Sequence, residues 1–268
     1  MISQPTRILQ LTDLHLFGDP KISLVGFNSY QSLQRIMLSV ADSIAKKPPS
    51  LLALTGDISQ DYSLASYEIA KKIFHNFPCK IAATMGNHDY SPTFIDFFGD
   101  PTQDSNKLFT LNDWRILFLN SNWPGHVGGQ LAQIELDFLR RTLATSCEQC
   151  IIIFLHHPVL PVGSYWLDKI MTNNAAQFLE IIDQYHNIKA VICGHTHQET
   201  NISRLGVTYL STPATSWQFA VQSYNFKLDT LMPGYRLIDL YKDGTFQTEV
   251  VRINYDDAFV PDLNSKGY

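Results

Sequence analysis

Residues 190–197 read AVICGHTH, a run of β-forming residues that ends in a glycine and two histidines. Residues 190–193 have the length and composition of a buried strand, and Gly194 lets the chain turn sharply after it. His195 and His197 then place two imidazoles side by side in the following loop. One histidine at a strand end is common, whereas a glycine followed by two of them points to a metal site.

The first two hundred residues repeat this alternation of short apolar runs and amphipathic segments. Buried strands are predicted at residues 7–12, 51–57, 80–86, 114–121, 150–157 and 190–195. Apolar residues spaced three and four apart predict helices at 29–47, 63–77, 128–144 and 172–186. Pro48-Pro49 is expected to end the first helix and Asn187 the last. These segments form a series of strand–helix units.

The pattern changes after residue 200, where strands follow one another without helices. They are predicted at 207–212, 225–230, 234–241 and 244–253, separated by turn signals such as Lys242-Asp243-Gly244. We therefore expect two packed sheets with helices outside, the second sheet being built late in the chain. No linker, repeat or low-complexity tract interrupts the sequence, which predicts a single domain over residues 1–268.

The composition and net charge limit the kinds of partner that this protein is expected to bind. Of the 268 residues, 45% are hydrophobic and 17% charged, as in ordinary globular proteins, and the net charge of -5 leaves no basic footprint for nucleic acid. No segment approaches the roughly 18 consecutive apolar residues of a membrane span. We expect a small-molecule substrate, no nucleic acid, no membrane association, and a monomer or homodimer.

The N-terminus and the cysteines bear on the compartment. The first residues lack the apolar core and the cleavage site of a signal peptide, and four cysteines are too few for a disulfide scaffold. A cytoplasmic protein with reduced thiols is expected. Cys147 and Cys150 have redox or zinc spacing, but no second pair lies near them in the sequence, so we interpret them as incidental.

Metal-ligating residue types follow five of the predicted strands. In α/β sheets ligands bind at the carboxyl ends of the strands, so these loops should converge on one edge. Seven groups are too many for one tetrahedral zinc and suit two divalent ions that share a carboxylate. The candidate ligands are Asp13, His15, Asp57, Asn87, His156, His195 and His197.

Asp57 is the expected bridge between the two ions, because it stands alone at its strand end. Mixed imidazole and carboxylate ligation fits iron, manganese or zinc better than calcium or magnesium, and we expect iron or manganese before zinc. Gly56, Gly86 and Gly194 should let the backbone approach the ions closely. Two divalent ions make this pocket positive inside an acidic protein, which favours a phosphate-containing substrate.

The motifs resemble in type, order and spacing those of the calcineurin-like metallophosphoesterases, over about residue 7 to residue 200. They are Asp13-x-His15, Gly56-Asp57, Gly86-Asn87-His88-Asp89, His156 and Gly194-His195-x-His197. The resemblance implies an α/β fold, the four-layer αββα sandwich of two mixed β-sheets flanked by helices. It also implies that Asp13, His15, Asp57 and His197 hold the first ion, and Asp57, Asn87, His156 and His195 the second.

One position in this ligand set is ambiguous. Adjacent strand residues point to opposite faces, so only one of His156 and His157 should reach the ions. The family pattern favours His156.

A two-metal site of this kind hydrolyses a phosphate ester by in-line attack of a metal-bridging hydroxide. His88, which adjoins Asn87 and has no expected metal role, is the candidate general acid for the departing oxygen. Asp89 either orients His88 or another imidazole, or is a turn-forming residue. No serine or cysteine nucleophile is required.

The residues that follow Asp57 in the sequence indicate the substrate class. Phosphoprotein phosphatases of this superfamily carry an arginine after the Gly-Asp motif, whereas this chain reads GDISQD, which favours a phosphodiester. Segments outside the metal motifs, such as GSYWLDKIMTNNAAQFLEII (163–182) and NFKLDTLMPGYRLIDL (225–240), resemble the bacterial class III cyclic AMP phosphodiesterases of the CpdA type. This resemblance implies hydrolysis of cyclic 3′,5′-AMP to 5′-AMP, with the phosphate held by His15, Asp57, Asn87, His88 and His197.

Other interpretations remain open from sequence. Phosphodiesterases acting on glycerophosphodiesters or 2′,3′-cyclic nucleotides share the metal motifs. A metal-free binding scaffold is a further alternative, but such a protein should have lost ligands, and none of the seven is missing. The aromatic segments Tyr165-Trp166 and Trp217-Phe219 either line the base or belong to the core.

Overall fold

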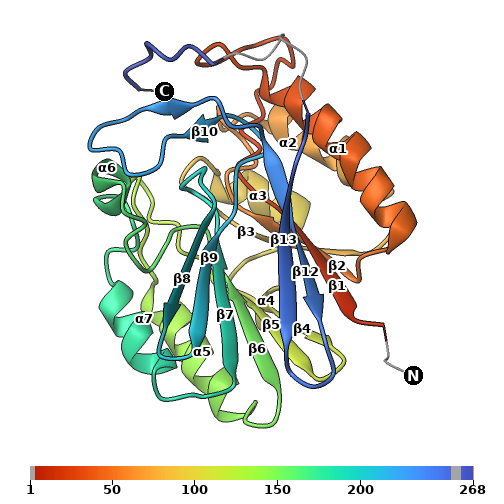
Figure 1. The fold of residues 1–268 in the computed structure, drawn as a ribbon, viewed down its shortest axis with the longest axis vertical. Helices are drawn as coiled ribbons and strands as arrows, with labels where there is room; N and C mark the ends of the chain where they lie inside the picture. The colour runs from red at the N-terminus through yellow and green to blue at the C-terminus, as the bar shows by residue number, and fades with distance from the viewer. Residues whose placement is uncertain (1–3, 255–260, 268) are drawn as a thin grey trace.

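Two large sheets packed face to face form the centre of the computed structural model, which describes residues 4–254 and 261–267 (Figure 1). The five-stranded first sheet has the order β13-β12-β1-β2-β3, and the six-stranded second sheet the order β4-β5-β6-β7-β9-β8. A small third sheet pairs β10 with β11. The strands are β1 Thr6–Leu11, β2 Leu51–Thr55, β3 Lys80–Thr84, β4 Leu108–Leu111, β5 Trp114–Phe118, β6 Cys150–Phe154, β7 Ile188–Cys193, β8 Thr200–Arg204, β9 Val207–Ser211, β10 Gln218–Phe219, β11 Leu228–Asp229, β12 Gly234–Leu240 and β13 Phe246–Arg252.

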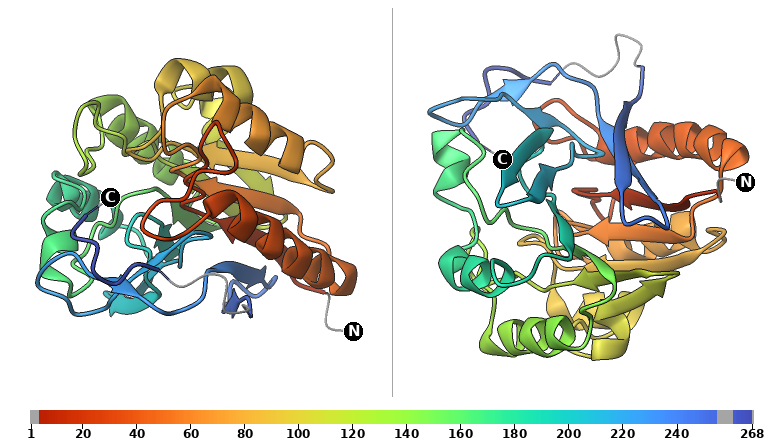
Figure 2. Two further views of the ribbon diagram at one scale, coloured as in Figure 1. Left: turned by 90° about the horizontal axis from the view of Figure 1, so that it is seen from above. Right: turned by 60° about the horizontal axis from the view of Figure 1, so that its bottom comes forward.

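Helices form the outer layers of this sandwich (Figure 2). Helices α1 and α2 pack on the outer face of the first sheet, and α5 and α7 on that of the second. The expected four-layer arrangement of two mixed sheets flanked by helices is therefore confirmed. The helices are α1 Ser29–Lys46, α2 Leu64–Phe74, α3 Ser91–Phe98, α4 Asp104–Lys107, α5 Gln133–Ala144, α6 Tyr165–Asp168 and α7 Ala175–Ile182.

Alternation along the buried strands produces three layers of core. In β1, Ile8 belongs to the cluster between the two sheets, whereas its neighbour Leu9 faces the helices of the first sheet. In β6, Ile152 likewise faces the other sheet and Ile153 faces α5 and α7. Successive side chains point to opposite faces of a strand, so strands covered on both sides are apolar throughout. This explains why the sequence shows continuous apolar runs.

The expectation that the second sheet is built late in the chain is wrong. The second sheet begins at β4, in the middle of the chain, and of the later strands β8 and β9 join it while β12 and β13 join the first sheet. β12 pairs antiparallel with β1, at the edge of β1 opposite to β2. Local sequence patterns report that a segment is extended, but not which strand edge it will cover.

Helix ends follow their capping residues. α1 begins after Asn28, whose side chain accepts a hydrogen bond from Gln31 N, and α2 begins after Ser63, which caps Ser66 N. α7 ends at Ile182 rather than at Asn187, whose side chain instead donates to the carbonyls of Ser146 and Gln149. The other predicted helix boundaries lie within a few residues of the observed ones. The largest difference at a helix start is in α5, which was predicted from residue 128 and begins at Gln133.

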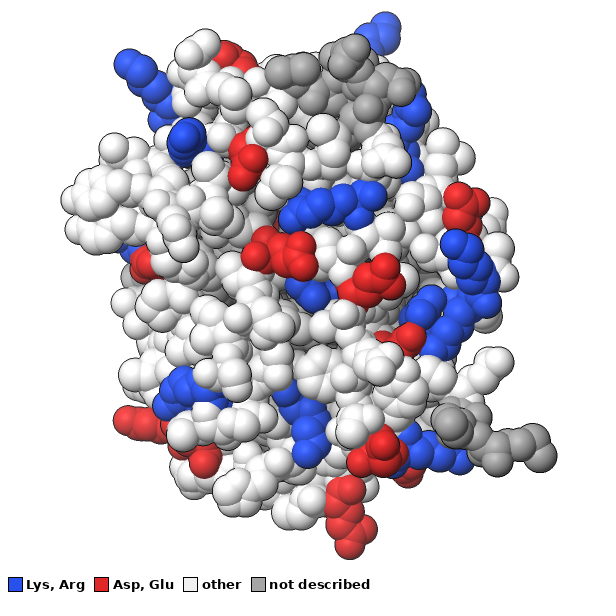
Figure 3. Space-filling model, viewed as in Figure 1, with Lys and Arg blue, Asp and Glu red and all other residues white. Residues whose placement is uncertain are grey.

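Surface features place few constraints on partners. Across residues 4–254 and 261–267, no helix combines the length and hydropathy that crossing a bilayer requires. On the face drawn in Figure 3, basic and acidic side chains are interspersed rather than separated by sign. The four cysteines are free thiols, and Cys147 and Cys150 form no disulfide.

Candidate metal centre

The loops after five parallel strands converge on one edge of the sandwich. Within the first sheet, the loop after β1 runs beside the loop after β2, with Asp13 N donating to Gly56 O and His15 N to Asp57 O. Across the sandwich, His195 N donates to both carboxylate oxygens of Asp13, each at 3.1 Å. The strand ends of both sheets thus meet in one cluster of polar side chains.

Left-handed backbone conformations aim these side chains at one another. Five of the seven candidate ligands have positive φ angles, a region that few residues other than glycine enter and in which Asn, Asp and His are enriched. A residue in this conformation points its side chain in a different direction from the one it would have if the strand continued. The five are Asp13 at 53°, His15 at 47°, Asp57 at 53°, His195 at 64° and His197 at 48°.

One part of the cluster gathers around Asp13, His15 and His197. The Nε2 atoms of His15 and His197 lie 3.0 Å apart, and His197 Nε2 lies 3.4 Å from Asp13 Oδ1. His15 Nε2 also lies 3.6 Å from Asp57 Oδ2. Asp13, His15 and His197 therefore present ligand atoms close to one another, and Asp57 approaches them through His15.

Asp57 joins this part of the cluster to the next. Its Oδ2 lies 3.6 Å from His15 Nε2 and 3.3 Å from His156 Nε2, while its Oδ1 accepts a hydrogen bond from His88 N at 2.8 Å. One carboxylate oxygen therefore stands between an imidazole from the first sheet and one from the second. That position suits a bridging ligand.

The hydrogen bonds on the far side of the rings favour a cation at the centre. His197 Nδ1 faces the carbonyl of Trp217 at 2.7 Å, and His156 Nδ1 faces that of Thr55 at 2.7 Å. A carbonyl only accepts, so both rings carry a proton on Nδ1, which leaves each Nε2 atom directed at the carboxylate oxygens. A nitrogen and a carboxylate oxygen at these distances attract each other only when a proton or a metal ion lies between them. Histidine ligands commonly donate the other N–H to a backbone carbonyl in this way.

Two further candidate ligands carry buried atoms that find no hydrogen-bond partner among the described residues. These atoms are Asn87 Oδ1 and His195 Nε2. Unpaired buried polar atoms are costly and need an explanation. Two divalent ions held by the seven groups provide one, so the side chains present fit the expected metals.

Electrostatics maintain the charge states that metal binding needs. Burial by itself raises the pKa of Asp57, but the neighbouring rings of His156 and His88 outweigh it and hold the pKa well below its usual range. Burial lowers the pKa of His15 and of His195 to about 3, which keeps both rings neutral. Burial also favours neutral His156, but the charges of Asp57 and Asp13 raise its pKa to about 9. A divalent ion would replace that proton.

Two of the glycines are required by close packing rather than by turn formation. A Cβ at Gly86 would lie 2.1 Å from Asp57 Oδ1, and one at Gly194 would lie 2.7 Å from Asp13 Oδ2. Each glycine lets backbone lie directly against a carboxylate.

The two adjacent histidines both lie beside His195 but differ in their hydrogen bonds. Both ring nitrogens of His157 are engaged, Nδ1 with Ser121 Oγ at 2.9 Å and Nε2 with Val127 O at 3.1 Å. His156, by contrast, presents Nε2 to Asp57. These contacts favour His156 as the ligand.

Asp89 is buried and accepts hydrogen bonds from the backbone of two loops. Its Oδ1 accepts from Ile58 N, Ser59 N and the Tyr67 hydroxyl, and its Oδ2 from Gly86 N. Burial, and then the charge of Asp57, raises its pKa to about 7. Because this carboxylate contacts backbone N–H groups and a phenol, its contacts favour an anchoring role over orientation of an imidazole.

The aromatic residues proposed from sequence to line the base occupy other positions. Trp217 and Phe219 are 1% exposed, with Trp217 stacked on His15 at 4.8 Å and Phe219 on His197 at 4.4 Å between ring centroids. They pack against the rings of two candidate ligands. Tyr165 lies at the surface, where it stacks on Tyr224.

Sequence reasoning missed the partner of His15. Gln60 Oε1 lies 2.5 Å from His15 Nδ1, opposite the nitrogen that faces the candidate metal position. Gln60 lies three residues after Asp57 in the same loop, so proximity to the motif was the available signal.

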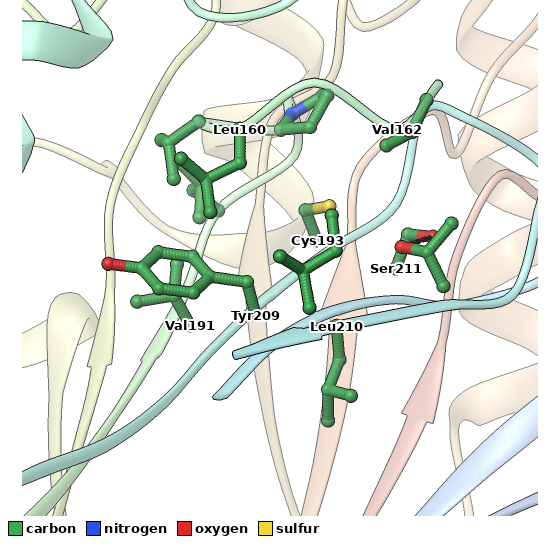
Figure 4. A pocket seen from close by; sticks show the side chains of 12 residues that line it. Leu160, Val162, Val191, Cys193, Tyr209, Leu210 and Ser211 are labelled. Carbon is green, nitrogen blue, oxygen red and sulfur yellow. Dashed lines mark hydrogen bonds between the residues drawn. The ribbon is translucent and has the colours of Figure 1, made fainter. Parts of the chain in front are cut away.

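A separate small cavity of about 20 Å³ is lined in part by Cys193 and is drawn in Figure 4. Its labelled walls, including Leu160, Val162, Val191 and Tyr209, are mostly apolar, and the candidate ligands do not line it. None of its lining residues belongs to the cluster of Asp and His side chains described above, so the candidate metal centre is the better candidate for a catalytic site.

Comparison with known proteins identifies the family of this chain. The calcineurin-like phosphoesterase family matches residues 6–199. The 3′,5′-cyclic adenosine monophosphate phosphodiesterase CpdA of Escherichia coli is 35% identical over 263 residues, covering 98% of this chain and 94% of that protein. A 3′,5′-cyclic-nucleotide phosphodiesterase of Nostoc is 33% identical over 257 residues, covering 96% of each.

Among solved structures, a dimetal phosphatase from Danio rerio has a TM-score of 0.68 at 12% identity, covering 94% of this chain and all of that one. That likeness extends the agreement to the fold. The chain belongs to the calcineurin-like phosphoesterase family.

Proposed function

We propose that this protein hydrolyses cyclic 3′,5′-AMP to 5′-AMP. The observation that carries the proposal is the 35% identity to CpdA of Escherichia coli over nearly the whole of both chains, which includes regions outside the metal motifs. The sequence GDISQD at residues 56–61 carries no arginine after the Gly-Asp motif, which favours a phosphodiester.

The seven clustered groups would hold two divalent transition-metal ions. Asp13, His15, Asp57 and His197 would hold the first, and Asp57, Asn87, His156 and His195 the second, with Asp57 as the bridge. The mixed imidazole and carboxylate set favours iron or manganese over zinc. When bound, two such ions activate water and neutralise charge on the phosphoryl oxygens.

The chain's own residues position the substrate and move a proton. Water adds to phosphorus as the bond to the 3′ oxygen breaks, and that oxygen leaves with a proton to give 5′-AMP. His88 is the proposed proton donor, since its backbone N–H is fixed on Asp57 Oδ1 while its ring lines an open groove. His15, Asp57, Asn87, His88 and His197 would surround the phosphate.

Asp89 acts, in this proposal, as a positioning residue. Its carboxylate ties the backbone after Asp57 to the turn at Gly86 and so fixes where Asn87 and His88 lie. The proposal also places the enzyme in the cytoplasm as a single domain over residues 1–268, acting as a monomer or homodimer.

The test is release of 5′-AMP from cyclic 3′,5′-AMP by protein loaded with manganese or iron. Asn87→Ala should abolish turnover, whereas Asn225→Ala, at an exposed position in the loop between β10 and β11, should leave it unchanged. Bis-p-nitrophenyl phosphate, 2′,3′-cyclic AMP and glycerophosphocholine are assayed beside it. Turnover of one of these with negligible hydrolysis of cyclic 3′,5′-AMP would overturn the substrate assignment and keep the two-metal site.

A further inference from the structure

A groove opens directly from the candidate metal centre. Its volume is about 510 Å³, and Asn87 and His88 form one wall. Its other walls come from Tyr62 and from the loop after β5, through Trp123 and His126. A phosphoryl group held by Asn87 therefore has a continuous path into this space.

The groove suits a flat, uncharged part of a ligand. Among the described residues that line it, none is lysine or arginine, so a second phosphate would find no countercharge there. Instead it presents aromatic rings, which offer faces on which a planar heterocycle stacks. A nucleobase has this chemistry, whereas the backbone of a nucleic acid does not.

Tyr62 is held at the groove by an unusual backbone. Its φ is 59°, which is an outlier for a bulky residue, and half of its surface is exposed. The neighbouring Asp61 fixes this turn by accepting hydrogen bonds from Ser63 N and Gly18 N. The Tyr62 ring lies nearly parallel to that of His88, at 17° and 6.4 Å between centroids. A strained conformation that exposes an aromatic ring beside the candidate general acid indicates a binding role.

Trp123 forms a second aromatic surface on the opposite loop. Its indole stacks on the His126 ring, with 3.5 Å between the ring centroids and 9° between the ring planes. The two rings therefore form one stacked pair. The preceding residue, Asn122, donates its side-chain N–H to Gly86 O. This hydrogen bond connects the loop that carries Trp123 to the turn that carries Asn87 and His88.

A buried ion pair supports the loop from below. Asn120 N donates to Glu135 Oε2, and the other oxygen of Glu135 pairs with Lys107 at 2.7 Å. Asn120 Oδ1 in turn accepts from Asn122 N. The position of Trp123 is thus determined by the core rather than by a loosely held loop.

We propose that this groove is the nucleobase subsite, with Tyr62 and Trp123 as its stacking residues. This inference rests on the proposed cyclic nucleotide hydrolysis and names where the base lies. It assigns specificity to residues outside the metal motifs, and neither of them is among the aromatic segments that the sequence had suggested.

The test compares two ligands that differ only in the base. Binding of 5′-AMP and of ribose 5-phosphate to manganese-loaded protein is measured by calorimetry. Stacking of one base typically contributes about 1–3 kcal/mol, so Tyr62→Leu and Trp123→Leu should each weaken 5′-AMP binding by at least about fivefold. Binding of ribose 5-phosphate should change by less than about twofold. Tyr62→Phe, which keeps the ring, should bind 5′-AMP like the wild type.

Tyr224→Leu is the matched control, since it removes an exposed aromatic ring outside the groove. An equal loss for both ligands in Tyr62→Leu would show that the residue is structural and overturn the proposal, as would unchanged 5′-AMP binding in both leucine variants. If the wild type binds 5′-AMP no more tightly than ribose 5-phosphate and does not hydrolyse cyclic 3′,5′-AMP, the proposed function itself has failed. Hydrolysis by the wild type with insensitive leucine variants overturns the subsite alone.

Discussion

The Nε2 atoms of His15 and His197 face one another at 3.0 Å, while the Nδ1 atom of each ring faces an oxygen atom. The oxygens belong to Gln60 and to the backbone of Trp217, on opposite sides of the pair. The two rings are therefore oriented by groups that lie outside the cluster. This arrangement is pre-organised to bind a cation between the two Nε2 atoms.

Metal loading should stabilise the fold. A ligand at one hundred times its dissociation constant contributes about 2.7 kcal/mol, which corresponds to a rise in Tm of about 5–10 °C for a chain of this size. We expect this shift when manganese is added to chelator-treated protein, as measured by thermal unfolding. Asp57→Asn should lose most of the shift, whereas Asp239→Asn, remote from the cluster, should retain it. Equal Tm values with and without manganese would contradict a metal centre.

The adjacent histidines should differ in their effect on metal content. His156→Ala removes the ring beside Asp57, so the bound metal should fall from two ions towards one per chain in elemental analysis. His157→Ala should keep two ions but lose about 1–3 kcal/mol of stability, because the ring contacts with Ser121 Oγ and Val127 O are lost while the backbone N–H of residue 157 still reaches Ser121. The reverse result would make His157 the ligand.

Gln60 should control the metal affinity through His15. Removal of such a hydrogen-bond acceptor typically weakens metal binding about 10–100-fold, and we expect this of Gln60→Leu in a manganese titration. Gln60→Glu, which keeps an acceptor oxygen, should recover most of the affinity. Gln133→Leu, an exposed position at the start of α5, serves as the control. Wild-type affinity in Gln60→Leu would remove Gln60 from the metal centre.

Asp89→Asn should act on stability more than on proton transfer. The amide has one acceptor oxygen in place of two and brings an NH₂ group towards backbone donors, so we expect a loss of at least about 2 kcal/mol in chemical denaturation. The pH profile of kcat should keep its shape in the fraction that folds. A displaced pH profile at unchanged stability would instead show that Asp89 orients His88.

Gly86→Ala should disrupt the site in a way that an alanine elsewhere does not. The added Cβ would lie 2.1 Å from Asp57 Oδ1 and 2.6 Å from Asp57 N, so the bridging carboxylate must move. We expect loss of tight manganese binding. Gly206→Ala, in the turn between β8 and β9 with open space around it, should cost about 1–2 kcal/mol of backbone strain and leave metal binding intact. Equal metal affinity in the two variants would show that Asp57 tolerates the displacement.

Much of the fold was predictable because its central strands are buried on both faces. Apolar runs ending in polar residues marked β1, β2, β3, β6 and β7, and the ligands follow each of them. β8, with the sequence TNISR, was missed because alternate residues lie at an exposed edge and the segment has little apolar character. The partners of the late strands were mispredicted, since sheet pairing depends on which edge remains open rather than on local sequence.

The candidate ligands were predictable, but the groups that orient them were not. Asp13 and His195 follow strands, where the residue type alone indicates chemistry. Gln60, Trp217 and Phe219 act through contacts made only after the two sheets assemble, and their types are common in loops and cores alike. Trp217 in particular looks from sequence like a substrate platform, and only its burial shows that it backs His15.

The origin of the ligands on two different sheets has a consequence for assembly. Asp13, His15, Asp57 and Asn87 come from the half of the sandwich that is rich in oxygen donors, whereas His156, His195 and His197 form an all-imidazole set from the other half. Neither half has the donors to complete both ion sites. The ions would therefore link the two sheets to each other, and both sites could be filled only where the sheets have come together.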